Sequence, residues 1–393
     1  MSTSEHGQIA FTESEERQTL RKQVSKLAAG YGREYFVRQA RGGGKTTDLW
    51  LDMGKHGYLG VSLPEEYGGG GGGIGDLAAV CEEVAAQGCP LLMMVVSPAI
   101  CGTVIGRFGT DEQKQRWLPS IADGTLTMAF AITEPDAGSN SHNITTTARR
   151  EGDGWALTGR KIYISGVDEA DAVLVVARAE DAKTGKLKPA LFVVPTDAEG
   201  FEYQRIEMEI VSPENQYTLF IDDVKLPADA LVGDENAGLM QLFAGLNPER
   251  ILVAAFATGI ARFALDKATE YVKGREVFGA PIATHQALSH PLAQSKIEIE
   301  LARLMTQKAA ALYDAGDDMG AGEAANMAKY AAAEAACAAA DRAVQAHGGN
   351  GITSEYGVAG LLVAARATRI APVSREMILN FVGSHSLGLP KSY

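Results

Sequence analysis

The chain has 393 residues, of which 46% are hydrophobic and 22% are charged, as is typical of a globular protein with two or three domains and a large core. Its formal net charge of -13 argues against nucleic acid or an anionic membrane as the main partner, because both favour a basic surface. No apolar run approaches the roughly 20 residues that span a bilayer, and no targeting peptide is visible at the N-terminus. We therefore expect a cytoplasmic protein.

Several common site patterns are not met. The four cysteines have no CxxC spacing, and their small or apolar neighbours predict free, buried thiols in a reducing compartment. His285 and His290 are five residues apart rather than four, so no metal site is predicted. The segment RGGGKTT, residues 41–47, lacks the first glycine and the preceding strand of a phosphate-binding loop.

The predicted elements change in kind twice along the chain. Helices are expected first, at residues 14–29, 76–88 and 111–124. Short β-rich runs separated by Gly, Pro and Asp turns follow at 153–166, 170–180, 189–197, 200–208 and 216–227. Helical patterns return at 252–275 and 321–351, and the second of these stops at Gly348 and Gly349.

This order indicates three domains. We expect an N-terminal helical domain over residues 1–125, a middle β-domain over 126–236 and a C-terminal helical bundle over 237–393. Strands and helices do not alternate throughout the chain, so a doubly wound α/β fold is excluded.

The segment AFAITEPDAGSN, residues 129–140, is the first candidate for a ligand site. A strand-like apolar run leads into a turn of small residues, which exposes backbone N–H groups and lets a planar or anionic ligand approach closely. About thirty residues later, GRKIYISG carries Tyr163 and Ser165 two positions apart, hence on one face of a strand. Together these two segments predict a binding site built on the β-domain.

The chain resembles the acyl-CoA dehydrogenase family over nearly its whole length. Seven segments match in family order: LGVSLPEEYGG, GTDEQKQRWLPSIADG, AITEPDAGSN, LTGRKIYISG, FIDDVKLPADALVG, REVFGAPIATHQA and QAHGGNGITSEY. The resemblance implies a mostly α fold with a central β-barrel-like domain and a C-terminal four-helix bundle. It also implies FAD as cofactor, a homotetramer built as a dimer of dimers, and an electron-transfer flavoprotein as oxidant.

The resemblance places part of the flavin site on the β-domain. Phe130, Ile132 and Thr133 match positions along the flavin ring, where Thr133 bonds the polar edge of the ring. Gly138 and Ser139 match the loop near the pyrophosphate. Tyr163 stands where many members have Trp, and Ser165 stands where many have Thr, donating to flavin N5.

A neighbouring subunit is implied to supply the rest of the cofactor site. Arg275 and Phe278 match residues that reach the pyrophosphate and adenosine end of FAD, where a permanent cation suits a diphosphate. Gln286, Gln345 and Gly349 match further contacts from the adjoining subunit. Taken singly, Gly349 is also explained as a helix cap and Phe278 as a core residue.

The implied reaction converts an acyl-CoA thioester to the trans-2-enoyl-CoA: a carboxylate removes the α-proton while the β-hydrogen leaves as hydride to flavin N5. The usual family base lies in a Tyr-Glu-Gly-Thr loop near the C-terminus. This sequence instead passes from Pro372, Val373 and Ser374 directly into its last helix. Isovaleryl- and long-chain-type members carry the glutamate before an arginine on the long helix after the β-domain, in the register of Glu249 here.

Glu249 is therefore the predicted base, with Arg250 as a supporting or structural cation. A structural interpretation also exists, because Asn247, Pro248 and Glu249 spell an N-cap, a first-turn proline and an acidic first turn. Glu376 is the second candidate, but it looks like an acidic residue at a helix start.

Two other functions fit the same residues. The short loop is compatible with a catalytically silent or partner subunit of a heteromeric acyl-CoA dehydrogenase. The same scaffold is also compatible with a flavoenzyme that acts on a substrate other than a thioester. Acyl chain length and branching cannot be read from the sequence.

Overall fold

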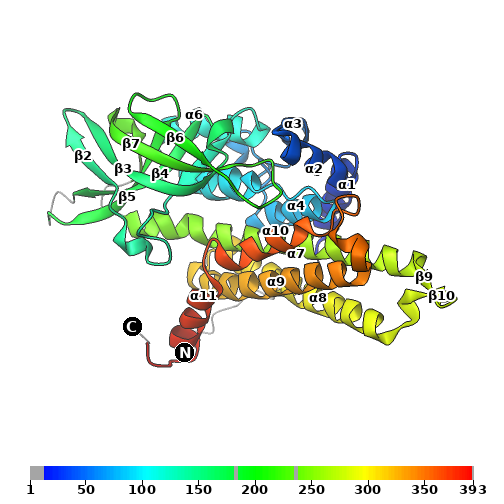
Figure 1. The fold of residues 1–393 in the computed structure, drawn as a ribbon. Coiled ribbons are helices and arrows are strands. Elements are labelled where there is room, and N and C mark those ends of the chain that lie inside the picture. Colours follow the sequence, from blue (N-terminus) through cyan, green and yellow to red (C-terminus); the bar gives the residue numbers. More distant parts are fainter. Residues whose placement is uncertain (1–12, 181–184, 234–237, 392–393) are drawn as a thin grey trace.

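Helices from both ends of the chain pack together and leave a group of strands at one end of the molecule (Figure 1). This computed structural model describes residues 13–180, 185–233 and 238–391. The order of helices, then strands, then helices is the fold class expected from the sequence. The domain boundary expected at residues 236 and 237 lies outside the described residues.

The N-terminal part is helical. Its helices are α1 (Glu15–Ala29), α2 (Gly32–Gly42), α3 (Thr47–Lys55), α4 (Ile74–Ala86), α5 (Thr103–Phe108) and α6 (Asp111–Asp123). The predicted helix at 76–88 is α4, which is buried along nearly all its length, including its two glutamates Glu82 and Glu83. A wide-turned helical segment, Val95–Gly102, precedes α5 and is also buried.

The middle part of the chain forms a sheet. Its strands are β1 (Met128–Ala131), β2 (Thr147–Glu151), β3 (Gly154–Ser165), β4 (Ala172–Glu180), β5 (Leu187–Pro195), β6 (Phe201–Ile206), β7 (Gln216–Leu226) and β8 (Leu231–Val232). Among the described residues, the strand order is β6-β7-β3-β2-β4-β5-β8, and β1 pairs with β4 in parallel.

Both faces of β4 are covered. Val173 and Val175 point into the core enclosed by the sheet, while Leu174 and Val176 pack against residues of α5 and α6. This strand is therefore a nearly continuous apolar run rather than an alternating one. It anchors β1 between the sheet and the N-terminal helices.

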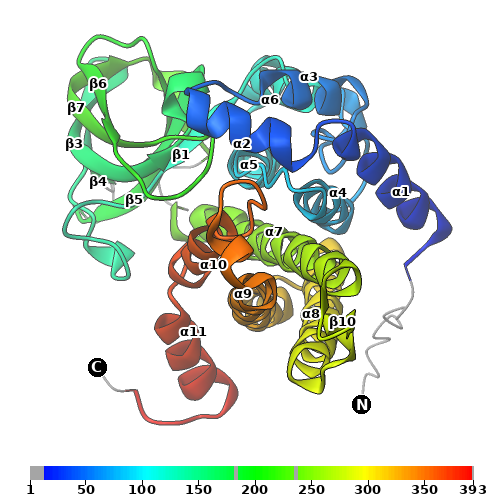
Figure 2. The same cartoon turned by 45° about the vertical axis from the view of Figure 1, so that its right-hand side comes forward.

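The C-terminal part is a helical bundle. It consists of α7 (Gly238–Gly274), a hairpin of β9 (Glu276–Val277) and β10 (Ala280–Pro281), and then α8 (Gln286–Asp314), α9 (Asp318–His347), α10 (Gly360–Ile370) and α11 (Arg375–Phe381). Helix α7 packs against α4 on one side and against α8 and α9 on the other. Figure 2 shows α11 standing away from the bundle, beyond α9 and α10.

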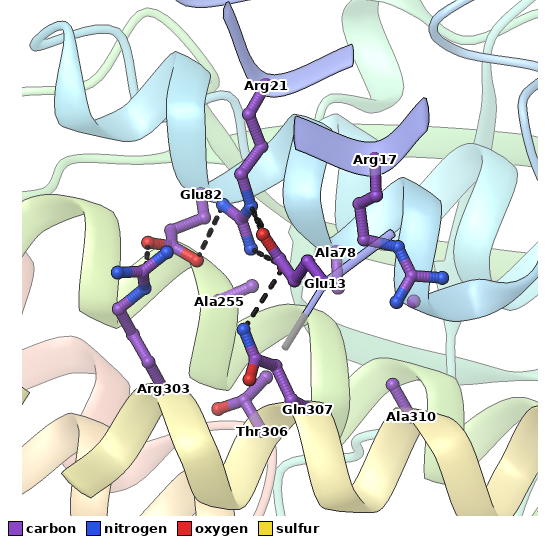
Figure 3. Close-up of a pocket in the computed structure, with 11 residues that line it drawn as sticks. Glu13, Arg17, Arg21, Ala78, Glu82, Ala255, Arg303, Thr306, Gln307 and Ala310 are labelled. Atoms are coloured by element: carbon purple, nitrogen blue, oxygen red, sulfur yellow. Dashed lines mark hydrogen bonds and ion pairs between the residues drawn. The ribbon is translucent and has the colours of Figure 1, made fainter. Parts of the chain in front are cut away.

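A buried ion cluster joins the two helical parts. Glu82 and Glu83 of α4 are almost fully buried, and Arg21 of α1 lies 2.9 Å from each carboxylate. Arg262 of α7 reaches them at 2.6 and 2.7 Å, and Arg303 of α8 reaches Glu82 at 2.9 Å. Figure 3 shows Arg21 and Arg303 approaching Glu82 from different helices. The charges are paired within this Glu82 cluster, so we assign it a structural role.

No helix in the described part of the chain is long and apolar enough to cross a membrane. Cys81, Cys89 and Cys101 are free and buried, as predicted, while Cys337 is only partly buried. Burial raises the pKa of the Cys89 thiol to about 12, so this thiol stays protonated at neutral pH.

Candidate active site

The end of β1 forms the first part of the site. Phe130 pairs with Leu174 of β4 in the parallel register. Phe130 and Ile132 are partly buried and pack on the apolar cluster between the sheet and α6. Thr133 follows directly and is also partly buried. The end of β1 and the two residues after it therefore place Phe130, Ile132 and Thr133 of the predicted flavin site at one edge of the core.

The turn after Thr133 is closed by its own backbone. Glu134 and Ala137 exchange two backbone hydrogen bonds, at 3.2 and 3.1 Å. Gly138 and Ser139 then lie exposed on the surface, and a Cβ added at Gly138 would meet no atom within 4 Å. The turn is therefore uncrowded at Gly138, and small residues of this kind let a ligand approach the backbone closely.

The buried side chain of Glu134 fixes this turn to the neighbouring segments. Its carboxylate accepts hydrogen bonds from the backbone and hydroxyl groups of Thr145 and Thr146, and it pairs with the fully buried Lys161 at 2.9 Å. Lys161 also donates to the Ile132 carbonyl at 3.0 Å. Burial alone would raise the pKa of Glu134, but the hydrogen bonds from Thr146 and Thr145 and the Lys161 charge lower it to about 2. The pair holds β1 against β3.

The last residues of β3 lie beside Thr133, because the Ile162 amide donates to the Thr133 carbonyl at 3.0 Å. Tyr163 adopts a left-handed backbone (φ 59°) at an irregularity in the β3–β7 pairing, and it is 57% exposed. Ser165 is partly buried, and its hydroxyl bonds the side-chain amide of Gln216. The residue between them, Ile164, is buried in the core of the sheet.

Glu249 approaches this region from α7. Leu246, one turn earlier, packs on the same apolar cluster as Phe130. The Sγ atom of Cys101 lies 3.5 Å from the Ala129 carbonyl of β1. Burial and the charge of Glu249 both raise the pKa of this thiol. Glu249 is mostly buried, and burial raises its pKa to about 7 although Arg250 and a nearby lysine act in the opposite direction.

The N-cap interpretation of Asn247 is wrong, because α7 begins at Gly238 and continues through Pro248. A proline has no amide hydrogen, so the Ala244 carbonyl one turn earlier loses its usual helical donor. The hydroxyl of Tyr313 on α8 donates to that carbonyl at 3.2 Å. Asn247 instead donates to the Asp318 carbonyl at 3.2 Å, which ties α7 to the start of α9.

Two cations lie near Glu249. Arg250 donates to the Asn247 side chain at 3.2 Å, and its Nε has no hydrogen-bond partner within the described part of the chain. Burial lowers the pKa of Arg250 despite the neighbouring Glu249. Lys329 of α9 is 1% exposed, and burial and the Arg250 charge lower its pKa to about 8. The carboxylate thus lies in apolar surroundings with buried positive charge close by.

The second candidate base has a different environment. Only residues 371–374 separate α10 from α11, and Ser374 caps α11 by accepting from the Met377 amide. Glu376 lies in the first turn of α11, and its side chain is 71% exposed. It is therefore a first-turn acidic residue of an exposed helix, as the sequence suggested.

The other predicted cofactor residues lie near the β9–β10 hairpin, at the end of the bundle that is farthest from the sheet (Figure 1). Phe278 is 97% exposed with a left-handed backbone (φ 55°) at the tip of the β9–β10 hairpin. Arg275, just before β9, is exposed and makes no ion pair in the portion that the structure describes. Gln286 at the start of α8 and Gln345 and Gly349 at the end of α9 are exposed as well.

A single chain does not bring the predicted cofactor residues near β1 (the β1 group) together with those near the β9–β10 hairpin (the distal group). Arg275 lies roughly 40 Å along α7 from Glu249, at about 1.5 Å per residue. Tyr271 stacks on His347 at 4.2 Å, which holds the end of α7 beside the end of α9 and so groups the distal residues. The β1 group and the distal group can belong to one ligand site only if a second chain supplies one of them.

Sequence reasoning missed Lys329, Lys161 and Gln216. Lys329 carried a readable signal, because it interrupts a buried alanine stripe between Ala325 and Ala332. A lone cation at a core position of a helix is a functional candidate. The pairing of Gln216 with Ser165 depends on the register of two strands, so no local signal was present.

Three family models match the chain in order: the N-terminal domain of acyl-CoA dehydrogenase over residues 14–125, the middle domain over 129–224 and the C-terminal domain over 236–387. The chain therefore belongs to the acyl-CoA dehydrogenase family. Acyl-CoA dehydrogenase FadE12 of Mycobacterium tuberculosis (strain ATCC 25618 / H37Rv) is 67% identical over 384 residues, which cover 98% of this chain and 99% of the relative.

Solved structures are similar over almost the whole chain. A glutaryl-coenzyme A dehydrogenase in complex with glutaryl-CoA has a TM-score of 0.93 and 30% identity, and the similarity covers 98% of both chains. Glutaryl-CoA dehydrogenase of Mycobacterium smegmatis in complex with FADH2 has a TM-score of 0.89 and 27% identity, with 97% of both chains covered. The protein is thus an acyl-CoA dehydrogenase, and its cofactor is FAD.

The residues present fit this cofactor. The open turn at Gly138 and Ser139 offers backbone groups to a phosphate, and the Ser165 hydroxyl lies at the partly buried end of β3. The exposed cation of Arg275 and the fully exposed ring of Phe278 suit a diphosphate and an aromatic base.

Proposed function

We propose that this protein dehydrogenates an acyl-CoA thioester to the trans-2-enoyl-CoA with Glu249 as the base. One observation carries the base assignment: Glu249 is mostly buried with its pKa raised to about 7, while Glu376 is exposed at a helix start. A base works best when its pKa lies near the operating pH. The short turn at residues 371–374 carries no carboxylate, so the base must come from another element.

The chain's own groups account for the proton transfer. The thioester carbonyl acidifies the α-hydrogen, and the Glu249 carboxylate takes that proton in surroundings from which water is excluded. FAD, when bound, accepts the hydrogen and electron pair lost from the β-carbon. Phe130, Ile132, Thr133, Tyr163 and Ser165 would hold its ring next to the substrate, and Gly138 and Ser139 would face its pyrophosphate.

We further propose that a second subunit completes each site. The exposed positions of Arg275, Phe278, Gln286, Gln345 and Gly349, far from Thr133, support this arrangement. A homotetramer built as a dimer of dimers is the proposed assembly, and an electron-transfer flavoprotein is the proposed oxidant.

Anaerobic stopped-flow reduction of the bound FAD tests the base. Glu249→Gln should keep its yellow colour but reduce at least about 10²–10⁴-fold more slowly with an acyl-CoA. Glu376→Gln is the matched control and should lose little. Near wild-type reduction of Glu249→Gln with loss in Glu376→Gln would reverse the assignment. Wild-type protein that binds FAD but is bleached by no acyl-CoA would favour a silent subunit.

A further inference from the structure

Lys329 occupies an unusual position in the bundle. Its side chain is 1% exposed, and its ammonium donates to the Val373 carbonyl at 2.5 Å. Within the described residues no carboxylate lies in ion-pair contact with it. An ammonium group has three donors and is costly to bury, so a single carbonyl acceptor is poor compensation for a purely structural lysine.

Charged groups from three helices influence the pKa of this ammonium. Arg250 of α7 disfavours its charge, while Glu249 of α7, Glu376 of α11 and Glu334 of α9 favour it. The charges of Arg250 and Lys329 both lower the pKa of Glu249, and the Glu249 charge raises the pKa of the Cys101 thiol. Lys329 is thus the cation that α9 contributes to the surroundings of the proposed base.

The same helix also holds the turn that replaces the missing loop. Glu334 accepts ion pairs from Arg369 of α10 at 2.8 Å and from Arg375 of α11 at 3.0 Å. These two arginines flank residues 371–374 on either side. Lys329 and Glu334 therefore tether the turn to α9 at its middle and at both ends.

We propose, on the basis of the function proposed above, that Lys329 is a positioning residue for proton abstraction by Glu249. Its ammonium fixes the turn at residues 371–374 and places one buried positive charge beside the base. A positive charge favours the ionised carboxylate, which is the form that accepts the substrate proton. The charge thereby offsets part of the cost of burying Glu249.

The pH dependence of flavin reduction separates the charge from the tether. Lys329→Gln keeps a hydrogen-bond donor for Val373 but removes the charge, Lys329→Met removes both, and Lys329→Arg keeps the charge. The rate of FAD reduction by acyl-CoA should rise as Glu249 ionises. We expect both neutral variants to move the midpoint of this rise to higher pH by about one unit, and Lys329→Arg to stay near the wild type.

Glu334→Gln is the matched control on the same helix. It removes the ion pairs that flank the turn but leaves the Lys329 charge, so it should speed amide hydrogen exchange in residues 371–378 without moving the midpoint. Wild-type midpoints in Lys329→Gln and Lys329→Met would overturn the proposal. If Glu249 is not the base, the result is different: Glu249→Gln would then retain rapid FAD reduction with any residue at position 329.

Discussion

The side-chain amide of Gln216 on β7 donates to the Ser165 hydroxyl oxygen at 2.9 Å, at the partly buried end of β3. The hydroxyl in turn donates to Gln216 Oε1 at 3.1 Å, so both atoms of the Gln216 amide hold it. With its oxygen still held by Nε2, the hydroxyl can exchange the Oε1 acceptor for a ligand. This places a second residue behind the hydroxyl that is proposed to face the flavin. It also explains how a flexible serine can keep one orientation.

Replacement of Gln216 by Leu should therefore change flavin binding through its effect on the Ser165 hydroxyl. We expect weaker FAD retention by about 0.5–1.5 kcal/mol, the usual net value of one hydrogen bond, together with a change in the visible spectrum of the bound flavin. Gln204→Leu on the exposed face of β6 is the control. If Gln216→Leu is additive with Ser165→Ala, the two residues do not act together.

The Tyr313 hydroxyl should stabilise the fold through the proline in α7. Tyr313→Phe leaves the Ala244 carbonyl without its donor and should cost about 1–3 kcal/mol of unfolding free energy. In a Pro248→Ala background the restored amide can donate to the same carbonyl, so the effect of Tyr313→Phe should shrink. Thermal unfolding of the four proteins in this cycle measures the difference. An equal loss in both backgrounds would contradict the explanation.

Burial of Glu249 should make stability depend on pH. The folded-state pKa of about 7 lies above the unfolded value of about 4.3, so the folded state binds this proton more tightly. Its contribution to stability is therefore present at low pH and decreases as pH rises from about 4 to about 7. Glu249→Gln should be more stable than the wild type at pH 8, by roughly 1–3 kcal/mol, and the difference should narrow toward pH 5. Glu376→Gln, at the exposed start of α11, is the control.

Removal of the exposed cation next to the hairpin should weaken cofactor binding. Arg275→Ala loses a charge-assisted contact worth about 1.5–3 kcal/mol, so we expect FAD affinity to fall by roughly 10–100-fold. Lys273→Ala, an exposed cation in the last turn of the same helix, is the control. Light scattering of FAD-saturated protein tests the shared site, and an active FAD-bound monomer would refute it.

Most of the fold was predictable because its signals are local. The strand predicted at 153–166 is β3 at Gly154–Ser165, and the helix predicted at 111–124 is α6 at Asp111–Asp123. Alternating or helical apolar periods and Gly or Pro turns mark these ends directly. Pro248 is the exception: the same local signal predicted a helix start, but contacts from α8 and α9 carry α7 through it.

The site was less predictable, because its supporting contacts join distant segments. The resemblance to a family suggested Glu249, Thr133 and Ser165 as site residues. Lys329 and Gln216 come close to them only through helix packing and strand register, which no single stretch of sequence encodes. Burial, which sets the raised pKa of Glu249, is likewise a property of the assembled bundle.

The Glu82 cluster has a consequence for how the chain is made. Arg262 enters the sequence 180 residues after Glu82, and Arg303 follows still later. During synthesis, Arg21 is therefore the only cation of the cluster available to the two carboxylates of α4 until most of the chain has left the ribosome. Burial of two carboxylates with one cation would be poorly compensated, so α4 can take its buried position only when α7 and α8 pack on it. The N-terminal helices and the C-terminal bundle should consequently reach their final packing in one late step, and an isolated N-terminal fragment should not fold stably alone.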